Sequence, residues 1–236
     1  MEKWNGYELR KEVLNGRNVV IQIPEKPNGK WALKTEYFDA FPDVQLRLLA
    51  LGYHVAHIQN ITRWHVWEDT DARAELVEYM HNSYGLSKKC VIIGMSCGGM
   101  QGIYFAAKYP QYVSCMYLDA PVINFLSCPA NMGKATEDEY EEFENATGFT
   151  KQELLSYRQH PLDYIPGLAK NNIPVILICG DTDCAVPYEE NGKLLNDEYE
   201  KAGAIIKTII KENCGHHPHG LEENMPIIDF IKEYDV

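Results

Sequence analysis

The chain has 236 residues, enough for one sizeable core, and we predict a single domain over residues 1–236. An apolar fraction of 45% with 24% charged residues is typical of a globular protein and excludes a disordered or fibrous chain. The formal net charge of −12 argues against binding to nucleic acid or to an anionic membrane, because both surfaces are themselves negative.

The sequence shows neither a targeting signal nor a membrane anchor. Charged side chains interrupt residues 1–10, and no run approaches the ~18 apolar residues that a membrane span needs. The seven cysteines are irregularly spaced and form no C-x-x-C pair, which favours free thiols in a reducing compartment. We therefore expect a cytoplasmic protein. The sequence does not indicate its oligomeric state.

The chain opens with an antiparallel hairpin and continues with alternating strands and helices. Two extended runs, 7–13 and 17–23, flank Asn15-Gly16, a dipeptide typical of two-residue hairpin turns. A helix over 39–50 is expected to begin at an Asp39 cap, and a helix over 69–84 at Asp69 or Thr70. Apolar runs predict the remaining strands at 30–35, 53–58, 91–93, 112–118, 173–179 and 204–210, and the remaining helices at 101–109, 188–202 and 221–231. This alternation predicts an α/β fold with a mostly parallel sheet covered by helices on both faces.

Residues 122–170 interrupt the alternation. Prolines and glycines break the pattern, so we interpret this segment as a short, mostly helical cap inserted over the carboxyl edge of the sheet. An acidic run at 137–144 is expected to be a solvated helix face and not a metal site.

The stretch Gly94-Met-Ser96-Cys-Gly98 follows a β-branched strand and precedes a helix. A strand-to-helix turn this sharp strains the residue at its apex and needs small residues two positions before and after it. Such a turn would present the Ser96 hydroxyl at the edge of the sheet, with the Cys97 N–H at the positive end of the helix.

A serine hydroxyl becomes a nucleophile only with an imidazole to take its proton and a carboxylate to orient that imidazole. Asp181 and Asp183 follow a late strand, and the histidine-rich loop 213–219 follows the last strand. All these groups lie where strands end, at one edge of a parallel sheet. The chain order Ser, Asp, His is the one that the α/β-hydrolase topology imposes.

These motifs resemble the α/β-hydrolase family over nearly the whole chain. Within that family the chain is similar to compact serine esterases and their dienelactone-hydrolase or prolyl-oligopeptidase-like relatives. The resemblance implies a mostly parallel, eight-stranded sheet. It implies Ser96 as nucleophile, Asp183 as acid by the G-x-x-D-x-x-V-P pattern of 180–187, and His216 as base by its Gly-His step. Asp181 remains the alternative acid.

The other histidines of the loop, His217 and His219, are rivals for the role of base. We expect them to be loop histidines bonded to the backbone. Because His217-Pro-His219 lacks an obvious third ligand, we predict no metal site, and no cofactor is implied.

The oxyanion hole is where the chain departs from the family pattern. Many members carry His-Gly-Gly after the third strand, whereas this chain has Lys34-Thr-Glu-Tyr-Phe38. The Cys97 N–H supplies one donor, and the second is expected from Glu36 or Tyr37.

The loop that follows the strand at 53–58 carries candidate substrate-binding residues. Trp64 and Trp67 could stack on a sugar or an aromatic leaving group, and Arg63 could meet a carboxylate. The alternative is that the tryptophans anchor the loop to the core. Three cysteines beside the proposed triad, at 97, 184 and 214, are expected to be small buried apolar residues.

The sequence thus predicts a serine hydrolase that cleaves a small-molecule carboxylic ester through an acyl-enzyme, with a short-acyl or acylated-sugar substrate. A peptidase or thioesterase is the alternative of the same class. A catalytically silent α/β-hydrolase that only binds a ligand is the alternative of a different class.

Overall fold

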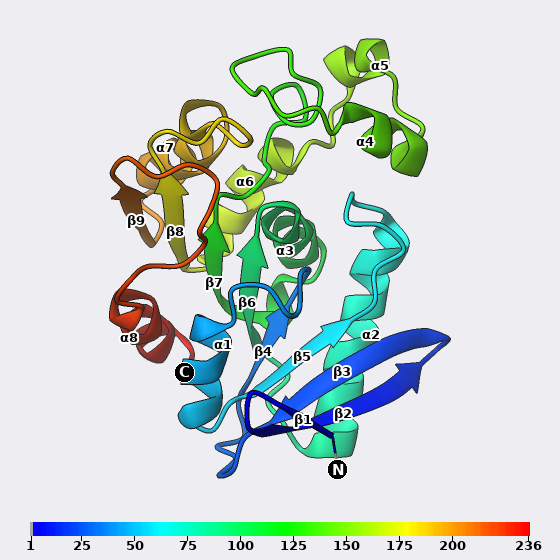
Figure 1. Ribbon diagram of the computed structural model, residues 1–236, viewed down its shortest axis with the longest axis vertical. Helices are drawn as coiled ribbons and strands as arrows, with labels where there is room; N and C mark the ends of the chain where they lie inside the picture. Colours follow the sequence, from blue (N-terminus) through cyan, green and yellow to red (C-terminus); the bar gives the residue numbers. More distant parts are fainter. Residues whose placement is uncertain (1) are drawn as a thin grey trace.

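A nine-stranded, mostly parallel sheet is the centre of the computed structural model, which describes residues 2–236 (Figure 1). The strands lie in the order β1-β2-β3-β5-β4-β6-β7-β8-β9. Antiparallel pairing joins β1, β2, β3 and β5, and parallel pairing joins the others. Their bounds are β1 Glu2–Trp4, β2 Tyr7–Leu14, β3 Arg17–Ile23, β4 Trp31–Lys34, β5 His54–Ile58, β6 Cys90–Met95, β7 Val113–Asp119, β8 Val175–Gly180 and β9 Ile206–Lys211. The predicted α/β-hydrolase fold is confirmed.

The sheet has one strand more than the eight predicted. The additional strand, β1, pairs antiparallel with β2, so that Glu2 faces Leu9. Glu2 and Lys3 are charged and exposed and Trp4 is partly buried, so the strand has no apolar pattern from which it could have been predicted. The predicted hairpin at Asn15-Gly16 is confirmed, because both residues have positive φ, 48° and 83°, as a two-residue hairpin turn requires.

The central strands are buried on both faces. Every residue of β6, β7 and β8 is buried, whereas β2 and the edge strand β9 contain partly buried and exposed positions. Continuous apolar runs of this kind are typical of parallel strands packed between two helical layers. Packing on both faces therefore fixes the positions of the carboxyl ends of β6, β7 and β8 relative to one another.

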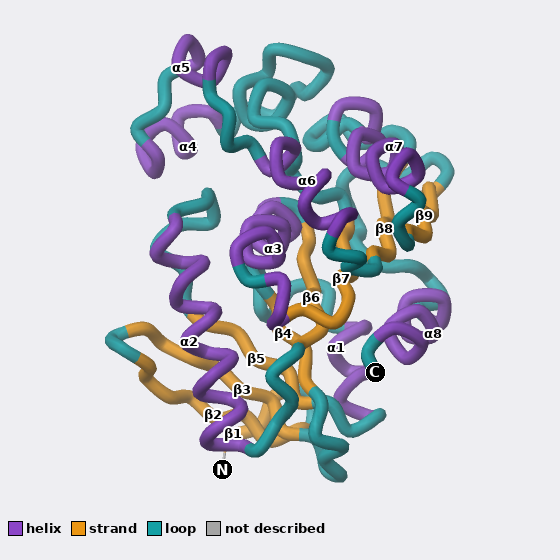
Figure 2. Tube along the Cα trace, turned by 180° about the vertical axis from the view of Figure 1, so that it is seen from behind, coloured by secondary structure: helices purple, strands orange, loops and turns teal. Residues whose placement is uncertain are grey.

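Helices cover both faces of the sheet (Figure 2). On one face α2, α3, α6 and α7 pack over a core that includes Ile92 and Leu177, and on the other α1 and α8 pack over Ile93 and Ile178. The bounds are α1 Asp43–Ala50, α2 Trp67–Tyr84, α3 Cys97–Lys108, α4 Tyr140–Thr147, α5 Lys151–Ser156, α6 Pro161–Lys170, α7 Gly192–Ala202 and α8 Met225–Tyr234, with 3-10 turns η1 Pro110–Tyr112 and η2 Tyr188–Glu190. Among residues 2–236, no helix combines the length and the apolar composition that crossing a bilayer requires.

The predicted starts of α1 and α2 are wrong. Asp39 does not cap α1, because its Oδ1 accepts a hydrogen bond from Trp4 Nε1 at 2.8 Å. Asp69 lies inside α2, where its buried Oδ1 accepts the N–H of Ile61 at 2.9 Å and pairs with Arg17. In both cases the carboxylate that was expected to cap the helix instead bonds to a residue that is distant in the sequence.

The segment 122–170 is less helical than predicted. Residues 122–139 form loops and turns, and α4, α5 and α6 follow. In Figures 1 and 2, α4 and α5 stand beyond the carboxyl ends of the strands, while α6 lies against α3 in the helical layer. A separate apolar cluster that includes Met100 and Phe143 joins this segment to α3.

Candidate active site

Ser96 lies in the tight turn between β6 and α3. Its φ of 51° and ψ of −121° form a strained conformation for a residue other than glycine, which costs about 1–3 kcal/mol. Its N–H donates to the carbonyl of Asp119 on β7 at 2.9 Å. A Cβ at Gly94 would lie 2.8 Å from the carbonyl oxygen of Gly98, so the turn closes only with glycine there. The turn presents the Ser96 hydroxyl at the carboxyl edge of the sheet.

His216 joins Ser96 to Asp183. Its Nε2 lies 3.1 Å from Ser96 Oγ, and its Nδ1 lies 2.8 Å from Asp183 Oδ2. Asp183 Oδ1 accepts the N–H groups of Ala185 at 2.9 Å and Val186 at 2.8 Å. The carboxylate side chain is only 1% exposed. A carboxylate fixed in this way holds the proton on Nδ1 and leaves the Nε2 lone pair facing the serine hydroxyl.

Asp181, the alternative acid, has another partner. Its Oδ1 accepts the N–H of Cys214 at 3.2 Å, and the side chain is exposed. Of the two aspartates that follow β8, Asp183 is therefore the one in contact with His216.

His219 forms a second carboxylate–imidazole pair beside the first. Its Nδ1 donates to Oδ1 of Asp119 at 2.8 Å, and Asp119 Oδ2 accepts from the Tyr117 hydroxyl at 2.8 Å and the Gly220 N–H at 2.7 Å. The expectation of a histidine bonded to backbone is wrong for His219, because the end of β7 supplies a buried carboxylate. The position of Asp119 at a strand end was the signal in the sequence that could have indicated this pair.

His217 is exposed and lies against an aromatic ring. Its imidazole stacks on Phe41, with centroids 5.4 Å apart and planes 15° apart. Burial, with smaller contributions from His216 and His219, lowers the pKa of His217. One ring nitrogen from each of these three histidines falls within 4.8 Å of the others. The sequence analysis found no third ligand beside His217-Pro-His219. In the structure, His216 is the third imidazole near these two.

Two backbone segments meet beside the serine. Cys97 is the first residue of α3, so its N–H has no acceptor within the helix. Tyr37, with φ of 53°, lines the same cavity as Ser96, and its N–H donates to Glu36 Oε1 at 3.3 Å. The Glu36 carboxylate also accepts from Asn60 Nδ2 at 2.6 Å, and Glu36 does not line the cavity. Of the two expected second donors, Tyr37 is the one that lines the cavity, and its N–H is bonded to Glu36 in this structure.

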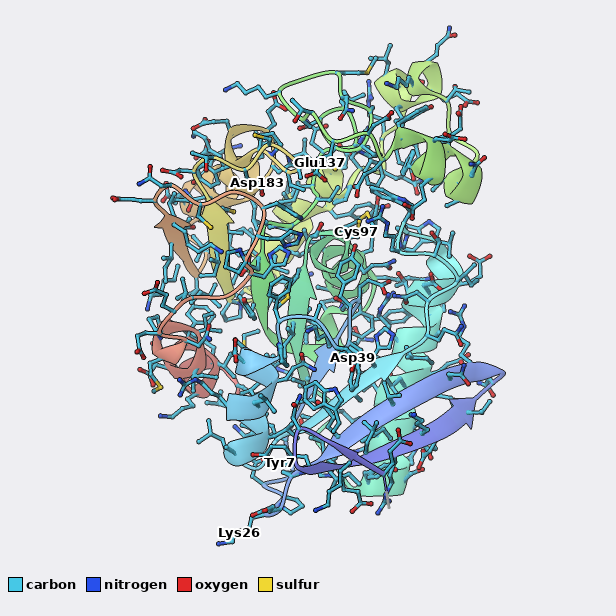
Figure 3. The ribbon with its side chains drawn as sticks, viewed as in Figure 1. Tyr7, Lys26, Asp39, Cys97, Glu137 and Asp183 are labelled. Carbon is cyan, nitrogen blue, oxygen red and sulfur yellow. The ribbon has the colours of Figure 1, made fainter. Side chains whose placement is uncertain are left out.

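A cavity of about 260 Å³ opens in front of Ser96. Figure 3 shows Cys97, Glu137 and Asp183 on the side of the sheet toward which β6, β7 and β8 point. The cavity walls combine apolar, acidic and imidazole side chains; the lining residues are Tyr37, Ala40, Phe41, Arg63, Ser96, Glu137, Glu139, Ala185, Val186, His216, His217 and His219.

Arg63 lines this cavity but is already paired. It donates to Glu142 Oε1 at 2.7 Å and to Glu139 Oε1 at 3.0 Å, with its side chain 27% exposed. The acidic run is therefore not only a solvated helix face, because Glu137 and Glu139 precede α4 and line the cavity. The sequence analysis did not identify these two glutamates or Phe41 as cavity residues, because all three lie outside the helices and strands.

The two predicted substrate-binding tryptophans lie outside the cavity. Trp64 is fully buried and meets Phe143 edge-on at 5.2 Å. Trp67 opens α2 and packs against Tyr104 and Tyr164, with centroids 5.5 Å and 6.0 Å away. Both indoles anchor their loop to the neighbouring helices, which was the alternative interpretation.

The three cysteines beside the site differ from one another. Cys97 is fully buried, and burial raises its pKa to about 12, so its thiol stays protonated. Cys184 is exposed and Cys214 is partly exposed. The expectation of a small buried residue therefore describes Cys97 alone.

The sequence matches a known family over most of its length. The model of the prolyl oligopeptidase family aligns with residues 58–234. That range includes the turn at Ser96 and the loops of Asp183 and His216. No curated protein sequence matches the chain.

Solved structures with similar folds include two long hydrolases and one protein of similar length. The acylaminoacyl peptidase of Pyrococcus horikoshii has a TM-score of 0.71 and 16% identity, with 92% of this chain and 40% of that one covered. A puromycin hydrolase has a TM-score of 0.74 and 14% identity, with 98% and 39% covered. The protein TT1662 from Thermus thermophilus has a TM-score of 0.63 and 15% identity, with 96% and 98% covered. The chain thus spans less than half of the two long hydrolases, and the likeness is one of fold.

Proposed function

Because this chain belongs to the prolyl oligopeptidase family, we propose that it is a serine hydrolase that cleaves a carboxylic ester with a short acyl group. The observation that carries the proposal is the contact of His216 with both Ser96, at 3.1 Å, and Asp183, at 2.8 Å. This contact lies at the wall of a cavity that can hold a substrate carbonyl.

The proposed mechanism passes through an acyl-enzyme. Ser96 Oγ attacks the ester carbonyl while His216 Nε2 takes the hydroxyl proton, and Asp183 stabilises the imidazolium. The N–H of Cys97 stabilises the oxyanion, and the N–H of Tyr37 adds a second donor once it leaves Glu36 Oε1, each such donor contributing about 3 kcal/mol to the transition state. His216 then protonates the leaving alcohol. In the second half a water molecule gives a proton to His216 as it attacks the acyl carbon, and His216 returns that proton to Ser96 Oγ as the carboxylic acid leaves.

The size and lining of the cavity support a short acyl group. Its volume of about 260 Å³ lies below the ≈300–1,000 Å³ typical of drug-sized ligand sites. Phe41, Ala185 and Val186 give it apolar walls. Since neither predicted indole reaches the cavity, the tryptophan stacking on which the acylated-sugar prediction depended is absent from the cavity wall.

A peptidase is the second candidate. One of the proteins that share this fold is by its name an acylaminoacyl peptidase, and this chain covers 40% of it. The carboxylate of Glu137 in the cavity would suit a substrate amino group. A catalytically silent ligand-binding protein is the non-enzymatic alternative, and the contact between Ser96 and His216 argues against it.

Labelling with a fluorophosphonate probe and hydrolysis of p-nitrophenyl acetate test the proposal. We expect wild type to react at Ser96 and Ser96→Ala to lose both signals, whereas Ser156→Ala, at an exposed serine of α5, keeps them. A series of acyl esters from acetyl to octanoyl should show the highest kcat/KM at the short end. A preference for aminoacyl anilides would favour the peptidase, and a folded wild type without label would favour the binding protein.

A further inference from the structure

Three histidines of one loop surround a single point at the wall of the cavity. The ring centroids of His216, His217 and His219 are 4.9 Å apart in every pair, and the rings stand steeply to one another, with interplanar angles of 63° to 84°. One nitrogen from each ring lies within 4.8 Å of the other two. The proposed mechanism uses only one of these imidazoles.

Two of the three rings are oriented by buried carboxylates. His216 Nδ1 donates to Asp183 and His219 Nδ1 donates to Asp119, each at 2.8 Å, and both carboxylate side chains are 1% exposed. These bonds fix the tautomer in which Nε2 carries a free lone pair. A carboxylate behind each ligating imidazole is the arrangement that zinc sites use to orient histidines and raise their basicity.

The three rings lie close enough for one tetrahedral metal ion to bring their nitrogens together. With zinc–nitrogen bonds of about 2.1 Å, three imidazoles around one ion place their ring centroids about 5 Å apart, close to the 4.9 Å observed. The imidazole nitrogens need to draw together from their 4.8 Å span. His217 can supply that movement, because it is exposed and held only by stacking on Phe41.

The surroundings attract cations. Glu137 lines the same cavity and the chain carries a net charge of −12, while Glu139 is paired with Arg63. Nitrogen ligands select zinc and its transition-metal neighbours over magnesium and calcium, which prefer oxygen.

We propose that His216, His217 and His219 bind a divalent transition metal ion, Zn²⁺ in particular, and that the bound ion switches the hydrolase off. The Nε2 lone pair of His216 cannot coordinate the metal and accept the Ser96 proton at the same time. Occupancy therefore removes the general base. The blocking of activity rests on the proposed function, whereas the metal binding does not.

Isothermal titration calorimetry with ZnCl2 tests the binding directly. The titration is done on a Cys184→Ser/Cys214→Ser protein, because these accessible thiols are themselves zinc ligands. We expect one saturable site, with affinity at least about tenfold weaker in His217→Gln and in His219→Gln. His81→Gln, which changes a histidine in the last turn of α2 whose Nδ1 bonds the Leu86 carbonyl, should keep the affinity of its parent. Zinc-free thermal denaturation of each variant checks that its fold is intact.

Absence of saturable binding in the Cys184→Ser/Cys214→Ser protein, or equal affinity in folded His217→Gln, would overturn the metal site. Activity gives the second readout. Zinc should abolish ester hydrolysis, EDTA should restore it, and His217→Gln should need at least about tenfold more zinc, with each rate normalised to its own zinc-free value. Tight binding with an unchanged rate would overturn the blockade alone. Binding in a protein that hydrolyses nothing would overturn the proposed function and leave the site.

Discussion

Replacing His65 with phenylalanine should make the protein less sensitive to acid. The His65 imidazole stacks on Tyr104, with centroids 3.6 Å apart and planes 14° apart, and meets Trp67 edge-on at 4.6 Å. Both ring nitrogens are buried, and neither makes a hydrogen bond within residues 2–236. Burial, helped by the positive charge of Arg73, lowers the pKa of His65 from 6.5 to about 3. Phenylalanine keeps the stacked ring and carries no proton.

The lowered pKa fixes the sign and size of the effect. Between pH 6.5 and about 3, the unfolded chain binds this proton and the folded chain does not, so the free energy of unfolding falls as the pH falls. One pH unit is worth about 1.4 kcal/mol for one proton, so at about pH 5 His65 costs wild type about 2 kcal/mol of stability. Above the unfolded pKa the cost disappears. The His65→Phe protein lacks this loss at every pH.

Urea unfolding followed by circular dichroism, at about pH 8 and about pH 5, measures the difference. The quantity to compare is the loss of unfolding free energy between the two pH values in wild type and in His65→Phe. Other buried histidines, such as His54 and His160, contribute equally to both proteins and cancel. Equal losses in the two proteins would refute the reasoning. Since His65 follows Arg63 and Trp64, the same protonation should also loosen the loop at the cavity.

Three further predictions concern the site. Asp183→Asn should lower kcat for ester hydrolysis by about 10⁴-fold, because His216 loses the acceptor that fixes its tautomer, while Asp181→Asn should stay near wild type; equal effects would contradict the assignment. Gly94→Ala should lower the melting temperature sharply, since its Cβ would lie 2.8 Å from the Gly98 carbonyl oxygen. Gly167→Ala, whose Cβ would meet no atom within 4 Å, should not. An unchanged melting temperature for Gly94→Ala would contradict the tight turn at Ser96. Arg63→Gln should speed limited proteolysis near residues 122–139 by releasing Glu139 and Glu142, and Lys193→Gln, which breaks a surface pair with Asp197, should not.

The strands were predictable because their signal is local. The runs that form β6 and β8 are apolar, and exposing them to water would cost several kcal/mol of free energy, about 25 cal/mol per Å² of apolar surface. Helix starts were less predictable, because a capping carboxylate has competitors. Asp39 bonds the indole of Trp4, 35 residues away, and Asp69 pairs with Arg17, 52 residues away. A sequence pattern contains no record of such distant partners.

The candidate site likewise has a part that could be predicted from the sequence and a part that could not. The order of Ser96, Asp183 and His216 could be read from the chain, because each follows a strand and the strand ends share one edge. The walls of the cavity could not. Glu137 and Glu139 come from a stretch without regular structure, so no periodicity assigned them a direction.

The residues of the proposed catalytic site lie at the ends of strands, whereas several residues of the cavity wall lie in loops. Tyr37 and Ser96 follow β4 and β6, Asp119 ends β7, and Asp183 and His216 follow β8 and β9. Parallel pairing holds these ends in register, with Met95 opposite Asp119 on neighbouring strands. Arg63 and the glutamates come instead from segments that join the strands, 59–66 and 122–139. Substitutions in those two segments should therefore change KM and substrate preference while the contact between Ser96 and His216 persists, because none of the residues that fix that contact belongs to them.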